Sequence, residues 1–167
     1  KFIFLHRWIK DEAKYTRLFE YNLETKALKL LSDNKMVSHC YWEDNETIIA
    51  YLKGPNNVDG YYRIHNEQIH HILKDLVDDG HPSTKEGYLV TDSYPDYRCY
   101  QTLWLSKTPY TETIQLGLFY SGFEFNGQKR CDLHPRWNFS NRKVTLDTVY
   151  SGFRQIVELD LNQVIED

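Results

Sequence analysis

The sequence of 167 residues contains only three cysteines, and no two of them form a CxxC pair. The odd number of Cys40, Cys99 and Cys131 argues against a disulfide framework and favours a reducing compartment. No apolar run approaches the length of a membrane-spanning helix, and no secretory signal peptide is visible. We therefore expect a cytoplasmic protein without a membrane partner.

A surplus of basic charge is also missing. Lysine and arginine number 20 against 24 acidic residues, so no basic surface predicts nucleic-acid binding. The chain has neither a glycine-rich phosphate loop nor a serine nucleophile elbow. Helical periodicity is nearly absent, and only residues 69–79 could form a short amphipathic helix. We expect a strand followed by a polar loop there.

The sequence is rich in aromatic residues, which make up 15% and include 13 tyrosines. Aromatic side chains pack well on pleated sheets, and the many short apolar runs separated by turns predict an all-β fold. Aromatic rings can also cover the faces of sugars, although packing within sheets accounts for most of these tyrosines.

Three copies of one repeat open on a histidine that is followed by a polar turn and an apolar run. The three histidines, His39, His81 and His134, are 42 and 53 residues apart. Propeller blades have about 40–45 residues, and an insertion at 120–131 explains the longer interval. If the repeats surround an axis, their histidines converge on it and predict a metal or anion site.

The repeats predict a β-propeller of about four four-stranded blades, the first lacking its opening strand. The expected blades are 1–33, 37–75, 79–120 and 132–165, and together they form one partial propeller domain. We expect this domain to be the C-terminal part of a larger propeller. Exposed blade edges would then favour self-association of the chain.

Several polar residues within the repeats have two interpretations. Asp92 and Asp147 end equivalent strands and are expected to bond turn backbone, with a catalytic role as the alternative. Residues 94–96 line a substrate mouth or form a turn. The outer-strand histidines, among them His70 and His71, are expected to be solvated, because adjacent strand residues face opposite ways.

Two stretches carry a resemblance to a known family. His81-Pro82-Ser83 followed by residues 89–96, and residues 132–137 followed by Asp147-Thr148, resemble the oligogalacturonate lyases and their bacterial relatives. The segments around His6 and His39 follow in the expected order. This resemblance implies a seven-bladed β-propeller that acts on uronate-containing oligosaccharides.

The resemblance implies a divalent metal, typically Mn²⁺, held near the propeller axis. His81 and His134 match ligand histidines of the family, and Asp132 stands where the family has a third histidine. A carboxylate also suits manganese, which accepts oxygen donors. The ligand glutamine of the family falls near Lys129, next to Gln128.

The resemblance further implies β-elimination, in which a base removes the proton beside a uronate carboxylate. The arginine base maps to Arg17, with Arg7 as second choice, and His39 lies near the active site. Side chains expected to contact the substrate are His6, Trp8, Tyr94, Arg130 and Arg136. The expected partner is an acidic oligosaccharide. The alternative is a non-catalytic propeller that binds a glycan or a protein.

Overall fold

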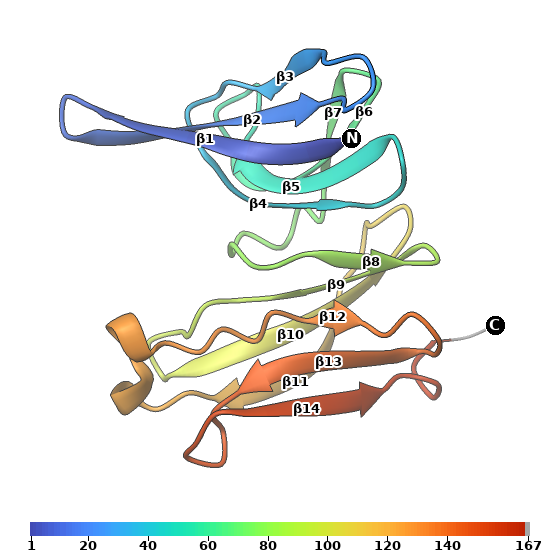
Figure 1. Cartoon of the computed structure of the whole chain (residues 1–167). Coiled ribbons are helices and arrows are strands. Elements are labelled where there is room, and N and C mark those ends of the chain that lie inside the picture. The colour runs from blue at the N-terminus through green and yellow to red at the C-terminus, as the bar shows by residue number, and fades with distance from the viewer. Residues whose placement is uncertain (166–167) are drawn as a thin grey trace. The chain divides into compact units, whose positions relative to one another are not determined.

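The computed structural model describes residues 1–165, and nearly all its regular structure is β-strand. The first two antiparallel sheets have the orders β1-β2-β3 and β4-β5-β6-β7, and the next two β11-β10-β9-β8 and β12-β13-β14 (Figure 1). The chain divides into two compact units, residues 1–77 and the remainder from Asp78 on.

The first unit holds two sheets. Their strands are β1 (Phe2–Lys10), β2 (Ala13–Tyr21), β3 (Leu28–Ser32), β4 (Val37–Trp42), β5 (Thr47–Lys53), β6 (Asp59–His65) and β7 (Gln68–Ile72). Strand β5 is buried along almost its whole length, as expected of a strand covered on both faces. Its side chains Ile48, Ala50 and Leu52 share one core cluster with Leu18 of β2.

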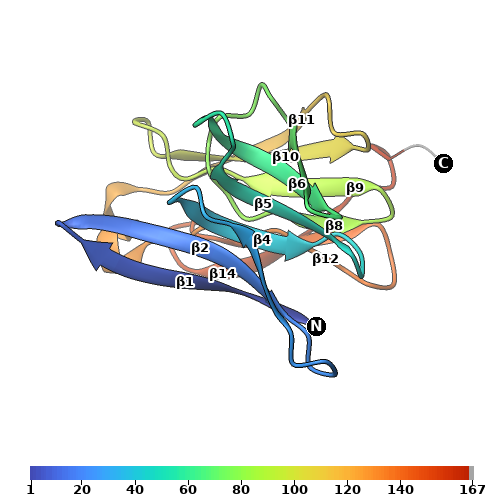
Figure 2. The same ribbon diagram turned by 90° about the horizontal axis from the view of Figure 1, so that it is seen from above.

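Strands β1 and β2 form a long hairpin, and the two strands lie side by side in both views (Figure 2). Alternation along β1 turns Ile3 and Leu5 toward the core cluster. The opposite face carries four directly paired couples, which are Phe2–Tyr21, Phe4–Phe19, His6–Arg17 and Trp8–Tyr15. Such directly opposed side chains contact one another, and the rings of Phe4 and Phe19 stack 5.5 Å apart.

The second unit holds the other two sheets. Their strands are β8 (Ser83–Lys85), β9 (Tyr88–Asp92), β10 (Tyr100–Lys107), β11 (Ile114–Tyr120), β12 (Arg136–Trp137), β13 (Lys143–Thr148) and β14 (Gln155–Asp160). Fully buried Val90, Leu103, Leu133 and Leu146 belong to one core shared by the two sheets. The inserted segment forms two short 3-10 turns, η1 (Phe123–Phe125) and η2 (Gly127–Lys129).

The all-β prediction is confirmed, and residues 68–72 form a strand followed by a non-helical loop, as expected. The four sheets fall within the four expected blade intervals. The first has three strands, as expected for a blade without its opening strand, whereas the last has three among the described residues where four were expected. In the last sheet, the chain turns after β14, where Leu161 O accepts hydrogen bonds from Val164 N and Ile165 N.

All three cysteines are free. Within residues 1–165, no helix is long and apolar enough to cross a membrane. The cytoplasmic location stays a prediction.

Candidate functional site

Two histidines of the repeat lie together in the second unit. His81 and His134 each precede the opening strand of their sheet, and their ring centroids are 3.7 Å apart with a tilt of 35°. One ligand atom from each histidine and one from Asp132 lie within 4.8 Å of one another. The structure thus gathers the three side chains that the sequence analysis named as metal ligands.

Asp92, at the end of β9, connects the two histidine loops. Its side chain is almost fully buried, with 1% exposed. Oδ1 accepts hydrogen bonds from His81 N at 2.6 Å and from His81 Nδ1 at 2.9 Å. Oδ2 accepts one from His134 N at 3.0 Å. This carboxylate bonds the backbone of two successive sheets, as expected, whereas Asp147 instead pairs with Arg136.

The backbone around Asp92 is tightly constrained. A Cβ on Gly80 would lie 1.8 Å from the carbonyl oxygen of Asp92, so only glycine fits beside it. His134 adopts a left-handed conformation with φ of 42°, which is uncommon for a residue with a side chain. Strained backbone of this kind is often found at functional sites.

Asp132 completes the cluster. It is 9% exposed, and Arg130 Nε lies 2.8 Å from its Oδ1. That oxygen has no well-aligned hydrogen bond among the described residues, because the better-oriented contact of Arg130 goes to Oδ2 at 3.1 Å. A buried carboxylate oxygen with capacity to accept is the kind of atom that takes a further ligand.

Tyr94 joins this cluster to a neighbouring pocket. The guanidinium of Arg130 lies 4.4 Å from the centre of the Tyr94 ring, and the ring of His81 meets that of Tyr94 edge-on at 6.0 Å. Burial raises the pKa of the Tyr94 phenol, and the negative charges of Asp79 and Asp132 raise it further. The phenol therefore stays protonated at neutral pH and can donate a hydrogen bond.

The pocket has a volume of about 240 Å³ and is built largely from the inserted segment. Its lining residues are Tyr94, Pro95, Asp96, Tyr97, Cys99, Ser121, Gly122, Phe123, Phe125, Asn126 and Arg130. Tyr94 and Arg130 were expected to contact substrate, and residues 94–96 do line a hollow. The sequence analysis missed Phe123 and Phe125, although their place in the insertion that breaks the repeat was an available signal.

The first unit holds the residues expected to be catalytic. Arg17, on β2, forms an ion pair with Asp33 and places its guanidinium 4.5 Å from the Trp8 ring centre. Its cross-strand neighbour His6 stacks on Trp8 at 5.3 Å. These three residues therefore share the aromatic face of the β1–β2 hairpin.

Three further residues that were expected to be catalytic or to contact substrate lie on the strands β1, β4 and β12. Arg7 is an exposed residue of β1. His39 lies within β4, opposite Tyr51, and its Nδ1 contacts Ser38 Oγ at 3.1 Å. Unlike His81 and His134, it is thus part of a strand and does not precede one. Arg136, on β12, is half exposed.

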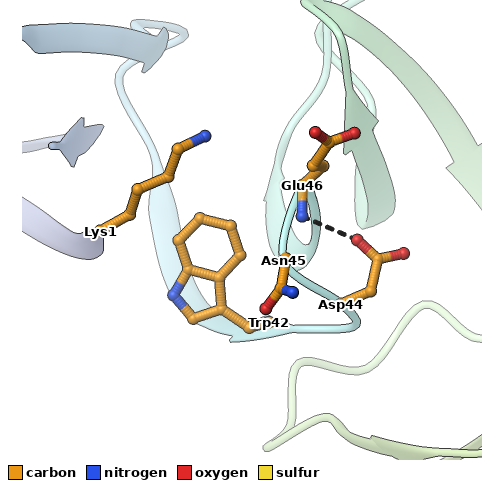
Figure 3. A pocket seen from close by; sticks show the side chains of 5 residues that line it. All are labelled: Lys1, Trp42, Asp44, Asn45 and Glu46. Atoms are coloured by element: carbon orange, nitrogen blue, oxygen red, sulfur yellow. Dashed lines mark hydrogen bonds between the residues drawn. The ribbon is translucent and has the colours of Figure 1, made fainter.

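A larger hollow of about 670 Å³ lies in the first unit and is lined by Lys1, Trp42, Asp44, Asn45 and Glu46. Figure 3 shows the Trp42 ring between the Lys1 side chain and the turn at 44–46. The carboxylate of Asp44 accepts hydrogen bonds from the backbone of Glu46 and Thr47. The Asp44 carboxylate therefore stabilises the turn at 44–46. We assign no chemistry to this hollow.

The spacing of the histidine cluster suits a metal ion after a small adjustment. A metal–nitrogen bond is about 2.0–2.1 Å long, so two ligands of one ion are at most about 4.2 Å apart. Atoms as much as 4.8 Å apart need to close by at least about 0.6 Å to reach that limit. Imidazole nitrogens with one carboxylate oxygen are a donor set that divalent transition metals accept.

Comparisons with known proteins bear on the fold. No protein-family model matches the chain, and no curated protein matches it. The crystal structure of TolB from Acinetobacter baumannii is similar, with a TM-score of 0.63 at 14% sequence identity. The match covers 95% of this chain and 38% of that one. The chain therefore has a β-propeller-like fold and spans well under half the length of this neighbour.

Proposed function

We propose that the second unit binds a divalent cation through His81, Asp132 and His134. The observation that supports it is the gathering of one ligand atom from each of these three side chains within 4.8 Å, although His81 and His134 are 53 residues apart in sequence. The donor set and the burial of Asp132 fit this role. We assign Mn²⁺ as the bound cation. A comparison with Zn²⁺ tests which of the two metals the donor set prefers.

We propose that the ligand beside this cation is an acidic oligosaccharide. Arg130 supplies a positive charge at the edge of the pocket, and guanidinium groups pair well with carboxylates. Tyr94, Tyr97 and Phe123 supply rings against which a sugar face can lie. The pocket volume of about 240 Å³ suits a single ring at this place.

The proposed activity is β-elimination at a uronate, as in the family that the sequence resembles. A bound divalent cation would neutralise the uronate carboxylate and so make the neighbouring proton more acidic. Arg130 would orient the carboxylate, and the protonated Tyr94 phenol would donate a hydrogen bond to a sugar oxygen. The assignment of Arg17 as base stays a prediction. Its ion pair with Asp33 counts against it, because a base must give up its proton.

The contacts of Arg17 favour a second candidate function. A chain that keeps the cation site and the aromatic pocket but lacks an available base would bind an acidic glycan without cleaving it. Arg17 is the residue whose contacts point this way, because both Asp33 and the Trp8 ring engage its guanidinium.

We also propose that the four sheets are successive blades of a larger propeller. The match to 38% of the TolB chain supports this reading, as does the agreement between sheets and blade intervals. The seven-bladed count comes from the family resemblance alone.

Calorimetric titration of the chelator-treated protein with Mn²⁺ and with Zn²⁺ tests the cation site. We expect stoichiometric binding that is lost in His134→Ala and kept in His70→Ala, a histidine on the outer strand β7. An unaltered isotherm for His134→Ala contradicts the site.

Incubation with oligouronides and Mn²⁺ then separates the two candidate functions. A rise in ultraviolet absorbance from an unsaturated product supports the lyase. Glycan binding by calorimetry without any product supports the binding module, and neither signal contradicts both.

A further inference from the structure

The buried carboxylate of Asp92 is not among the proposed ligands, yet it contacts both histidine loops. Asp92 is 1% exposed and accepts hydrogen bonds from His81 N, His81 Nδ1 and His134 N. We propose that Asp92 is the positioning residue of this site, which fixes the proton of His81 on Nδ1 and holds the backbone of His134. The metal part of this inference rests on the proposed function.

The first step concerns the tautomer of His81. An ionised carboxylate can only accept hydrogen bonds, so the ring nitrogen facing it must carry the proton. His81 Nδ1 lies 2.9 and 3.1 Å from the two oxygens of Asp92. The lone pair of the neutral ring is therefore on Nε2.

His134 is arranged in the same way by a different acceptor. Its Nδ1 lies 3.2 Å from the carbonyl oxygen of Asp132, which also can only accept. Both rings thus present Nε2 with its lone pair. Histidines that bind metals commonly donate their other N–H to a carboxylate or a backbone carbonyl, which orients the ring.

The second step concerns the backbone of His134. Its φ of 42° is unfavourable for a non-glycine residue and requires support from its surroundings. The hydrogen bond from His134 N to Asp92 Oδ2 supplies that support from a fully buried acceptor. One carboxylate therefore sets both the ring of one histidine and the chain direction of the other.

Asp92→Asn tests the inference, because an amide keeps the size of the carboxylate but can accept on only one side. Nitrogen-15 spectra of the imidazoles, recorded without metal at alkaline pH, report the tautomers. We expect Nδ1–H on His81 in the unmodified chain. In Asp92→Asn we expect either a mixed tautomer at His81 or a shifted, faster-exchanging His134 amide.

Asp147→Asn is the matched control, because Asp147 lies next to the last residue of the equivalent strand β13 in the next sheet but pairs with Arg136. It should change neither signal. A proton on Nε2 of His81 in the unmodified chain would overturn the inference. So would His81 and His134 signals that stay unchanged in both Asp92→Asn and Asp92→Ala.

Titration with Mn²⁺ and Zn²⁺ adds the functional readout. Loss of an outer-shell partner commonly weakens metal affinity by about 10–100-fold, which is the fall expected for Asp92→Asn. An unchanged affinity in a variant with altered tautomers would overturn the metal part of the inference. If the unmodified chain binds no metal, the proposed function fails, and the spectra still decide the role of Asp92.

Discussion

The two units hold their repeat histidines in different ways. In the first unit, His39 lies inside β4, where the pleat of the strand fixes the direction of its side chain. In the second unit, His81 and His134 lie just before short strands, and the hydrogen bonds that they donate to a buried acid fix them. Equal places in a repeat therefore do not give equal environments.

The charged residues of the two units differ in the same sense. Arg17 and Asp33 form an ion pair whose side chains are 37% and 43% exposed. Asp92 is buried and bonds two backbone amides. Burial makes the second arrangement costly to break, because each partner that loses its bond stays away from water.

Substitution of Asp92 in the second unit and of Asp33 in the first should give the largest difference in stability. Asp92→Ala leaves two backbone N–H groups without a charged acceptor, at about 1.5–3 kcal/mol each, so we expect a loss of about 3–6 kcal/mol. Asp33→Ala breaks an exposed pair and should cost about 0–1 kcal/mol. Urea unfolding measures both. Equal effects of the two substitutions would remove the distinction between the units.

The next largest effect concerns the proposed ligands. His81→Ala removes a ligand, so its loss of Mn²⁺ affinity should exceed the outer-shell range and reach at least about 100-fold. His6→Ala, on the aromatic face of the hairpin, serves as the matched histidine from the first unit. Its effect on affinity tests whether the His6 position expected from the resemblance belongs to the same site. We expect less than about threefold for a residue whose ring contacts Trp8 and Phe19.

Much of the fold could be predicted from the sequence, because local sequence patterns determine where the strands form. Alternating and continuous apolar runs marked the strands, and the repeat marked the sheets. The last sheet was expected to have four strands and has three among residues 1–165, because the repeat pattern alone does not fix the number of strands in each sheet.

The site was predictable only in part. The ligand group of His81, Asp132 and His134 came from a resemblance, and Tyr94 and Arg130 proved to share a pocket beside it. Asp92 was expected to bond turn backbone, but its contact with the ring of His81 could not be predicted, because the arrangement depends on a left-handed His134 and on the close approach of Gly80. The contacts of Arg17 depend likewise on a cross-strand register that the sequence leaves open.

A lysine in each unit provides a smaller contrast. Lys85 Nζ donates to three carbonyl oxygens, those of Asn138, Phe139 and Asn141, and so fixes the turn between β12 and β13. Lys85→Met leaves these carbonyls to water and should cost about 1–2 kcal/mol. Lys53→Met, which breaks an exposed pair with Asp59, should cost less than about 1 kcal/mol. Hydrogen exchange of the 138–143 amides locates the effect, and unchanged exchange in Lys85→Met would contradict this role.

The smallest effect is one in which the two units should agree. The pKa of Asp44 is lowered, chiefly by the Glu46 backbone hydrogen bond, and that of Asp96 chiefly by the Tyr100 backbone hydrogen bond. A lowered folded-state pKa adds stability above the unfolded value of about 3.9, and this stability is lost as the pH falls through the folded pKa. Carboxyl NMR titration should place both midpoints below the ordinary value. A normal midpoint for only one of them would mean that its turn frays in solution, and would extend the contrast between the units from buried acids to exposed ones.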